Sequence, residues 1–135
     1  DAAMPVDRPY LDEESSEGWH HYLLATVTFG DAKSEPDPAE LADALACLAE
    51  LEADKSFYFK LIGHTDSRGA ASLNQHLSLA RARAVRDLVA ESTGIQTWRL
   101  LAQGRGLDFP IADNATPDGQ AQNRRVELFA VRTTM

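Results

Sequence analysis

The sequence predicts an α+β fold, a β-α-β-α-β-β two-layer sandwich with a mixed sheet and both helices packed on one face. Two observations support this fold class: two strand-like segments are each followed by a helical segment, and two more strand-like segments close the chain. The chain has 135 residues, of which 44% are hydrophobic. This is enough for one domain with a proper core and too little for two.

The first strand and the first helix are expected in the amino-terminal half. Residues 20–29 are rich in β-branched and aromatic side chains and are followed by a Gly-Asp turn signal, which predicts a strand. Asp37 suits the N-cap of a helix, Pro38 its first position, and Glu40 the third position after the cap. An apolar stripe then follows at helical spacing, and the helix should end near Asp54. The stripe consists of Leu41, Leu45 and Leu48.

The second strand is expected at residues 57–62 and should be ended by Gly63. A second helix is expected from Ser72, with Gln75 completing a capping box, to about residue 92, where Gly94 stops it. Its predicted core stripe is Leu73, Leu77, Ala80, Ala84 and Leu88.

Two further strands are expected at residues 98–103 and 125–132. In the second of them, Val126, Leu128 and Ala130 should face one side of the sheet, with their neighbours on the other. The residues between these strands, 104–122, are predicted to form a long polar loop, and such loops tend to be functional or mobile.

Composition divides the chain into two parts, and charge and hydropathy disfavour several classes of protein. Residues 1–18, rich in acids and poor in apolar periodicity, are predicted to be a linker or an N-terminal extension before a domain at residues 19–135. The formal net charge is −8, which disfavours a nucleic-acid partner. No apolar run approaches the roughly 20 residues needed to span a bilayer, and no signal peptide is visible. Cys47 has no partner for an internal disulfide.

The segment from Gly63 to Arg86 contains the residues that indicate function. Asp66 follows the second strand, and Asn74, Ser78 and Arg81 fall at helical spacings of four and three on the next helix. A carboxylate accepts from an ammonium group, and a guanidinium grips a carboxylate through two parallel hydrogen bonds. The pair therefore suits a ligand that carries both an amine and a carboxylate, and indicates binding rather than catalysis. Spacing alone leaves open that Asp66 caps a loop and that Arg81 is a surface residue.

Four sequence blocks follow one another in a recognisable order. They are Ile62-Gly63-His64-Thr65-Asp66-x-x-Gly69, Asn74-x-x-Leu77-Ser78-x-x-Arg81-Ala82-x-x-Val85, Gly104-x-Gly106 and Asn123-Arg124-Arg125-Val126-Glu127. In this order the blocks resemble the OmpA-like domain. This domain is the peptidoglycan-binding module of outer-membrane porin-type proteins, peptidoglycan-associated lipoproteins and flagellar motor stator subunits. The resemblance covers about residues 20–132 and implies the same β-α-β-α-β-β fold.

The resemblance implies non-covalent binding of the peptidoglycan stem peptide through its diaminopimelate, with no cofactor, metal or enzymatic activity. Asp66 and Arg81 match the family positions that contact diaminopimelate, whereas Thr65, Asn74, Leu77 and Arg124 match neighbouring positions of the cleft. The implied location is the periplasm of a Gram-negative bacterium, at the cell wall and the outer or inner membrane. Membrane attachment through a region outside these residues, and a homodimer, are left open.

Two alternatives to this function are kept. The first is a small metal-dependent hydrolase that uses His64 and Asp66, although the sequence supplies no further ligands at recognisable spacing, and a structural role of His64 is favoured. The second is a protein-interaction domain that has lost ligand binding. Contacts from residues 30–36 are also open, because this turn is only a loose match to the family.

Overall fold

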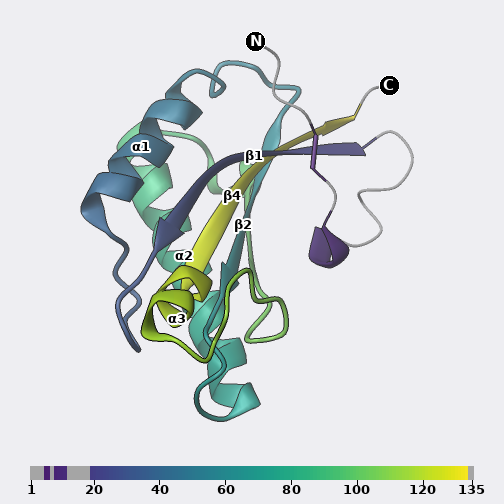
Figure 1. Cartoon of the computed structure of the whole chain (residues 1–135). Helices are drawn as coiled ribbons and strands as arrows, with labels where there is room; N and C mark the ends of the chain where they lie inside the picture. The colour runs from purple at the N-terminus through teal and green to yellow at the C-terminus, as the bar shows by residue number, and fades with distance from the viewer. Residues whose placement is uncertain (1–4, 7, 12–18, 134–135) are drawn as a thin grey trace.

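The computed structural model describes residues 5–6, 8–11 and 19–133, and its elements form two layers (Figure 1). They are β1 Trp19–Thr28, α1 Pro38–Ala49, β2 Tyr58–His64, α2 Ala71–Thr93, the 3-10 turn η2 Thr97–Arg99, β3 Leu100–Gly104, α3 Pro117–Asn123 and β4 Arg125–Thr133. The strands pair in the order β1-β4-β2-β3. β2 and β3 are parallel, whereas β4 is antiparallel to both β1 and β2. The predicted α+β fold with a mixed sheet is therefore confirmed.

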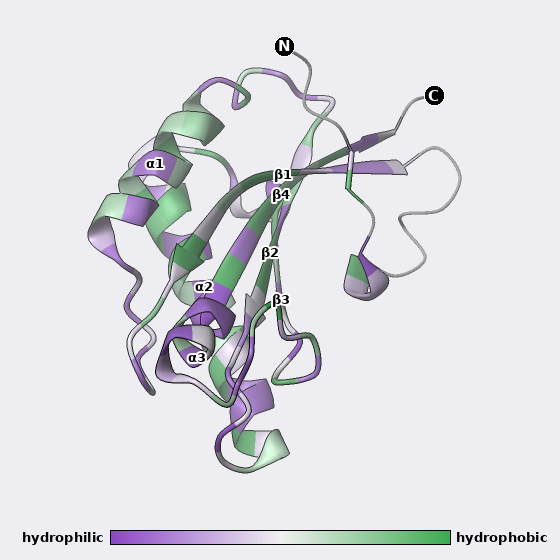
Figure 2. Cartoon of the chain, viewed as in Figure 1, coloured by the Kyte–Doolittle hydropathy of each residue, from purple (hydrophilic) through white to green (hydrophobic). Residues whose placement is uncertain are grey.

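The helices α1 and α2 cover one face of the sheet and enclose the main core (Figure 1). Val126, Leu128 and Ala130 of β4 are fully buried beneath them, as their alternation predicted. Figure 2 shows hydrophobic residues along the strands, whereas α3 and the loop beside it are largely hydrophilic. Burial of a whole Val or Leu side chain contributes roughly 1.5–3 kcal/mol, so this face provides most of the stability.

The opposite face of the sheet is covered in part by the N-terminal residues that the structure describes. Val6 pairs with His21 of β1, and a single 3-10 turn at residues 9–11 buries Tyr10 and Leu11 in a second apolar cluster. The purple turn in Figure 1 lies on the side of the sheet away from α1 and α2. The rest of the predicted extension, residues 1–4, 7 and 12–18, lies outside the described residues, and the domain boundary after residue 18 stays a prediction.

The start of α1 is as predicted, but its end is not. The Asp37 carboxylate accepts a hydrogen bond from the Glu40 N–H at 3.0 Å, and Pro38 is the first helical residue. The helix ends at Ala49, five residues before the expected Asp54, and turns follow it. No helix within the described parts of the chain is long and apolar enough to cross a membrane.

The predicted inner face of α2 was wrong. Leu73 is 69% exposed, and the buried positions are Asn74, Ser78, Arg81, Ala82, Val85 and Val89, one residue further along each turn. The expected capping box is absent as well: the N-cap is Ala70, and the Gln75 amide donates to the Gly104 carbonyl at 2.7 Å. Polar side chains lie inward here because hydrogen bonds satisfy them, which apolar periodicity cannot reveal. Gly94 ends the helix in a left-handed conformation, as expected.

Two paired glycines explain how α2 lies so close to the sheet. Gly63 of β2 and Gly104 of β3 are partners in the parallel ladder. A Cβ on Gly63 would lie 2.0 Å from the Ser78 carbonyl oxygen, and one on Gly104 would lie 2.6 Å from the Leu79 nitrogen. Both positions therefore exclude any larger residue. Gly63 was predicted to end the strand, but β2 continues through it to His64, so the glycine provides room for the helix.

The segment before β4 also differs from the prediction. Residues 117–122 of the expected loop, together with Asn123, form α3, whose N-cap Thr116 accepts from the Gly119 N–H at 3.0 Å and is followed by Pro117. The Thr-Pro pair was a helix-start signal within the polar stretch. The preceding strand begins two residues later than expected, because Trp98 and Arg99 belong to η2.

Candidate functional site

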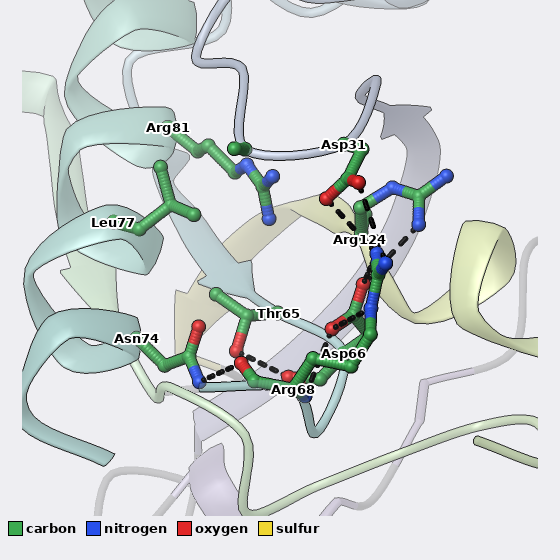
Figure 3. A pocket seen from close by; sticks show the side chains of 9 residues that line it. Asp31, Thr65, Asp66, Arg68, Asn74, Leu77, Arg81 and Arg124 are labelled. Atoms are coloured by element: carbon green, nitrogen blue, oxygen red, sulfur yellow. Dashed lines mark hydrogen bonds and ion pairs between the residues drawn. The ribbon is translucent and has the colours of Figure 1, made fainter. Parts of the chain in front are cut away.

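A cavity of about 90 Å³ opens where α2, the end of β2 and the turn after β1 meet. Asn74, Leu77 and Arg81 reach it from α2 on one side (Figure 3). The opposite side is formed by charged residues of three other segments, and Thr65 lies between the two sides. These charged residues are Asp31, Asp66, Arg68 and Arg124. All six residues predicted from the sequence therefore line one pocket, and their role in binding remains a prediction.

Asp66 is held as an ionised carboxylate by two arginines. Its side chain is 7% exposed and accepts from the Arg68 Nε at 3.2 Å and Nη2 at 2.8 Å, and from the Arg124 Nη1 at 3.2 Å. The Arg68 backbone N–H donates to the same carboxylate at 3.0 Å. Burial alone would raise the pKa of Asp66, but these hydrogen bonds outweigh it and lower the pKa to about 2.

The three side chains of the motif Asn123-Arg124-Arg125 lie in three different environments. The Asn123 amide binds the backbone of Ile111 and Ala112 and so holds the loop before α3. Arg124 donates from Nε to the Phe29 carbonyl at 2.9 Å and reaches Asp66 in the pocket. Arg125 points to the other face of the sheet, where it is fully buried beside Glu127. Only Arg124 of the three contributes to the pocket.

Arg81 is fully buried and is bound to backbone oxygens. It donates from Nε to the Lys33 carbonyl at 2.8 Å, from Nη1 to the His64 carbonyl at 3.1 Å, and from Nη2 to the Gly30 carbonyl at 3.3 Å. Its guanidinium carbon also lies 5.2 Å from the centre of the Phe29 ring. The side chain therefore fixes the turn after β1 as one lip of the pocket.

No carboxylate of the described residues bonds to Arg81, and this leaves its charge only partly balanced. Burial and the charge of Arg124 lower the pKa of Arg81 to about 10, against the opposing effect of Asp66 and Asp31, so the group is still a cation at neutral pH. A guanidinium has five N–H groups, and the three bonds to carbonyls leave one on each terminal nitrogen. A carboxylate could accept from these two together.

The remaining predicted residues shape the pocket. Thr65 is 3% exposed, and its backbone N–H donates to the Gly106 carbonyl at 2.9 Å, which joins the end of β2 to the loop after β3. The Asn74 amide donates to the Arg68 carbonyl at 2.8 Å and so holds the loop of Asp66 against α2. Leu77 is the larger of the two apolar side chains in the lining.

His64 belongs to a separate buried cluster on the opposite face. Its Nε2 lies 3.0 Å from Glu127 Oε1, which also accepts from the Tyr10 hydroxyl, and Arg125 Nε lies 3.3 Å from Glu127 Oε2. Burial lowers the pKa of His64 despite the nearby carboxylate, so the ring is neutral and donates from Nε2. This agrees with the structural role favoured for His64.

The hydrolase alternative depends on His64 and Asp66 acting together, but the two residues bind different partners. Asp66 contacts the arginines of the pocket, and His64 contacts Glu127 beneath Tyr10. Within the described ranges no group of three or more His, Cys, Asp or Glu is placed to hold a metal ion.

Sequence reasoning missed three residues of the pocket: Asp31, Ala32 and Arg68. Arg68 had a signal, because an arginine two positions after the key aspartate can fold back onto it. Asp31 and Ala32 lie in the turn that matched the family only loosely. Ala32 has a left-handed conformation, with φ of 59°, which places Asp31 at the rim.

Comparison with known proteins assigns the chain to one family. The model of the OmpA family matches residues 28–124, and the chain belongs to that family. Outer membrane porin F of Pseudomonas aeruginosa is 52% identical over 65 residues, 48% of this chain, and the match spans 19% of the porin's length. The resemblance inferred from the four sequence blocks is therefore confirmed.

Two solved structures show the same fold. The peptidoglycan-associated lipoprotein of Burkholderia pseudomallei matches with a TM-score of 0.72 and 27% identity, over 78% of this chain and 89% of the lipoprotein chain. The cell wall anchor of the T6SS of Pseudomonas aeruginosa matches with a TM-score of 0.62 and 31% identity, over 87% of this chain and 83% of the anchor.

Proposed function

We propose that this domain binds peptidoglycan non-covalently and thereby anchors a cell-envelope protein to the cell wall. The names of two similar structures, a peptidoglycan-associated lipoprotein and a cell wall anchor, support this function. A location in the periplasm of a Gram-negative bacterium agrees with the outer-membrane relative. Attachment to a membrane would then be made by a region outside these residues.

The proposed ligand group is the free end of diaminopimelate in the stem peptide. One carbon of that end bears both an ammonium and a carboxylate. The ammonium would bind Asp66, and the carboxylate would accept from the two remaining N–H groups of Arg81. One observation supports this assignment most strongly. Arg81 is fully buried, and within the described residues its hydrogen-bond partners are all backbone carbonyls. Binding of a ligand carboxylate would complete its charge balance.

Retention on isolated peptidoglycan tests the function with three variants. Asp66→Asn removes the charge that would hold the ammonium, and should weaken binding roughly 30-fold or more. Arg81→Lys keeps a cation but loses the planar fork, and should weaken binding roughly tenfold. Arg81→Ala is less informative, because it would also release the turn after β1. Arg83→Lys on the exposed side of α2 is the matched control.

A titration with two stem peptides tests the ligand group. One peptide contains diaminopimelate and the other contains lysine, which lacks the terminal carboxylate. The wild type should prefer the diaminopimelate peptide, and Arg81→Lys should lose most of that preference. Full retention of both folded pocket variants on peptidoglycan would refute the proposal.

A further inference from the structure

The Asp66 carboxylate already binds a cation from its own loop. Arg68 presents Nε and Nη2 to the two oxygens of Asp66 at 3.2 and 2.8 Å, in a side-on arrangement. These oxygens are the acceptors that the proposed function assigns to the ligand ammonium. Arg124 Nη1 also donates to one of these oxygens, Asp66 Oδ2, at 3.2 Å. A ligand amine can reach Asp66 fully only if one of these donors moves.

Arg68 is the donor that can move. Its side chain is 47% exposed, whereas that of Arg124 is 14% exposed and is also bound to the Phe29 carbonyl. The loop itself does not depend on the Arg68 side chain, because the Arg68 backbone N–H binds Asp66 and its carbonyl binds Asn74. Departure of the guanidinium would therefore leave the pocket walls in place.

A second acceptor for the same guanidinium lies further out. Asp31 at the rim is 67% exposed and accepts from Arg68 Nη2 at 2.9 Å and Nη1 at 3.3 Å. Arg68 thus bridges an inner and an outer carboxylate (Figure 3). A guanidinium displaced from Asp66 would still pair with Asp31, so the displacement is a short outward movement.

We propose that Arg68 is a built-in competitor for the ligand ammonium: it occupies Asp66 in the free protein and is displaced toward Asp31 when the stem peptide binds. This inference rests on the proposed function and adds a regulator to the same site. Arg68 lowers the affinity for amine-bearing ligands, because each must break the contact between Arg68 and Asp66. A ligand without the amine can pair with Arg81 and leave Arg68 in place.

Calorimetric titration of Arg68→Ala tests the competition. Because half-exposed ion pairs are weak, the variant should bind the diaminopimelate peptide roughly three- to fivefold more tightly than the wild type. A peptide in which hydrogen replaces the terminal amine should not gain affinity. Arg83→Ala removes the same charge from an exposed position of α2 outside the pocket and should change neither affinity.

The outcomes separate this inference from the proposed function. Tighter binding of the amine-bearing peptide alone supports the competition. Unchanged or weaker binding by Arg68→Ala, with normal binding by the wild type, overturns it, and weaker binding would show that Arg68 contacts the ligand. Failure of the wild type and both variants to bind either peptide would instead refute the proposed function, and the competition with it.

A measurement on the free protein tests the same contact without any ligand. Arg68 is among the groups that lower the pKa of Asp66 to about 2. Carboxyl carbon NMR should therefore show a higher pKa of Asp66 in Arg68→Ala than in the wild type, and no change in Arg83→Ala. An identical pKa in all three proteins would show that Arg68 does not occupy Asp66 in solution and would overturn the inference.

Discussion

The Asp66 cluster of the pocket and the Glu127 cluster on the other face of the sheet are made of similar groups. In both, neighbouring groups hold the pKa of a carboxyl at about 2 although burial opposes this: the hydrogen bonds of Arg68 and Arg124 act on Asp66, and the hydrogen bond of His64 and the charge of Arg125 act on Glu127. The partners of Glu127 are closed off: His64 is 1% exposed, and Arg125 is fully buried. Asp66 instead binds Arg68, which is about half exposed, beside an open cavity.

The exposure of the partners, rather than the low pKa, therefore distinguishes the proposed binding site from the structural cluster. The two clusters are joined through His64, whose ring binds Glu127 and whose carbonyl accepts from Arg81 in the pocket. The Glu127 cluster thus positions one wall of the pocket that contains Asp66. Four predictions test this division, from the largest expected effect to the smallest, and a fifth concerns the turn at the pocket rim.

Removal of the buried carboxylate should have the largest effect on stability. Glu127→Ala would leave Arg125 buried without its carboxylate and remove the acceptor of His64 and Tyr10, at a cost of about 3–5 kcal/mol. Urea denaturation measures this loss. Tyr10→Phe, which removes a single donor, is the control and should cost about 1 kcal/mol. A loss below that of the control would show that the cluster is not structural.

The equivalent change in the pocket should affect binding and leave stability largely intact. Asp66→Asn keeps one oxygen as an acceptor for the largely buried Arg124 and frees the half-exposed Arg68 to solvent, so the free energy of unfolding should change by about 1 kcal/mol. Retention on peptidoglycan should be lost in the same protein. If Asp66→Asn were as destabilising as Glu127→Ala, the proposed division between the clusters would be wrong.

Acid should affect stability and ligand affinity differently. Burial lowers the pKa of His64 from 6.5. Its contribution to the free energy of unfolding is therefore present above pH 6.5 and is lost as the pH falls below that value. The pKa of Glu127 is lowered from 4.5 to about 2. Its contribution to the free energy of unfolding, about 3 kcal/mol, is therefore lost as the pH falls through that interval. Stability should therefore decrease steadily on acidification, as chemical denaturation at several pH values would show.

The affinity for the stem peptide should behave differently over the same range. Asp66 has a pKa of about 2 and Arg81 one of about 10, so both stay charged between about pH 4 and about pH 8. Titration of the folded protein should give a nearly constant affinity. A strong decrease of affinity near pH 6 would indicate that His64 titrates in contact with the ligand, contrary to its placement.

The smallest effect is expected in the turn at the pocket rim. Ala32 has a φ of 59°, a left-handed conformation that disfavours side chains with a Cβ. Ala32→Gly should relieve this strain and, after the entropic cost of glycine, stabilise the protein by roughly 0.5–1 kcal/mol. Thermal unfolding measures the gain. A loss of stability would show that packing of the Ala32 methyl group stabilises the protein more than the backbone strain destabilises it.

Sequence patterns predicted the order of the four strands with α1 and α2, the cap at Asp37 and the alternation of β4, but not α3. They failed for the inner face of α2, where Asn74 and Arg81 lie inward and Leu73 lies outward. Periodicity assigns apolar residues to the core, but here backbone carbonyls and the neighbouring loop satisfy the polar groups. The two glycines that let α2 approach the sheet were visible in the sequence, but their pairing depends on the parallel register.

The sequence by itself determined the family, the order of the strands with α1 and α2, and six residues that line the pocket, because local patterns and motif spacing reside in the chain. Only the tertiary structure decided which charges meet. Asp31 and Arg124 come from segments distant in sequence. Asp31 meets Arg68 and Arg124 meets Asp66 only because the turn after β1, the loop after β2 and the start of β4 pack together. Ion pairs between such segments depend on distances of a few ångströms, and these distances exist only in the folded protein.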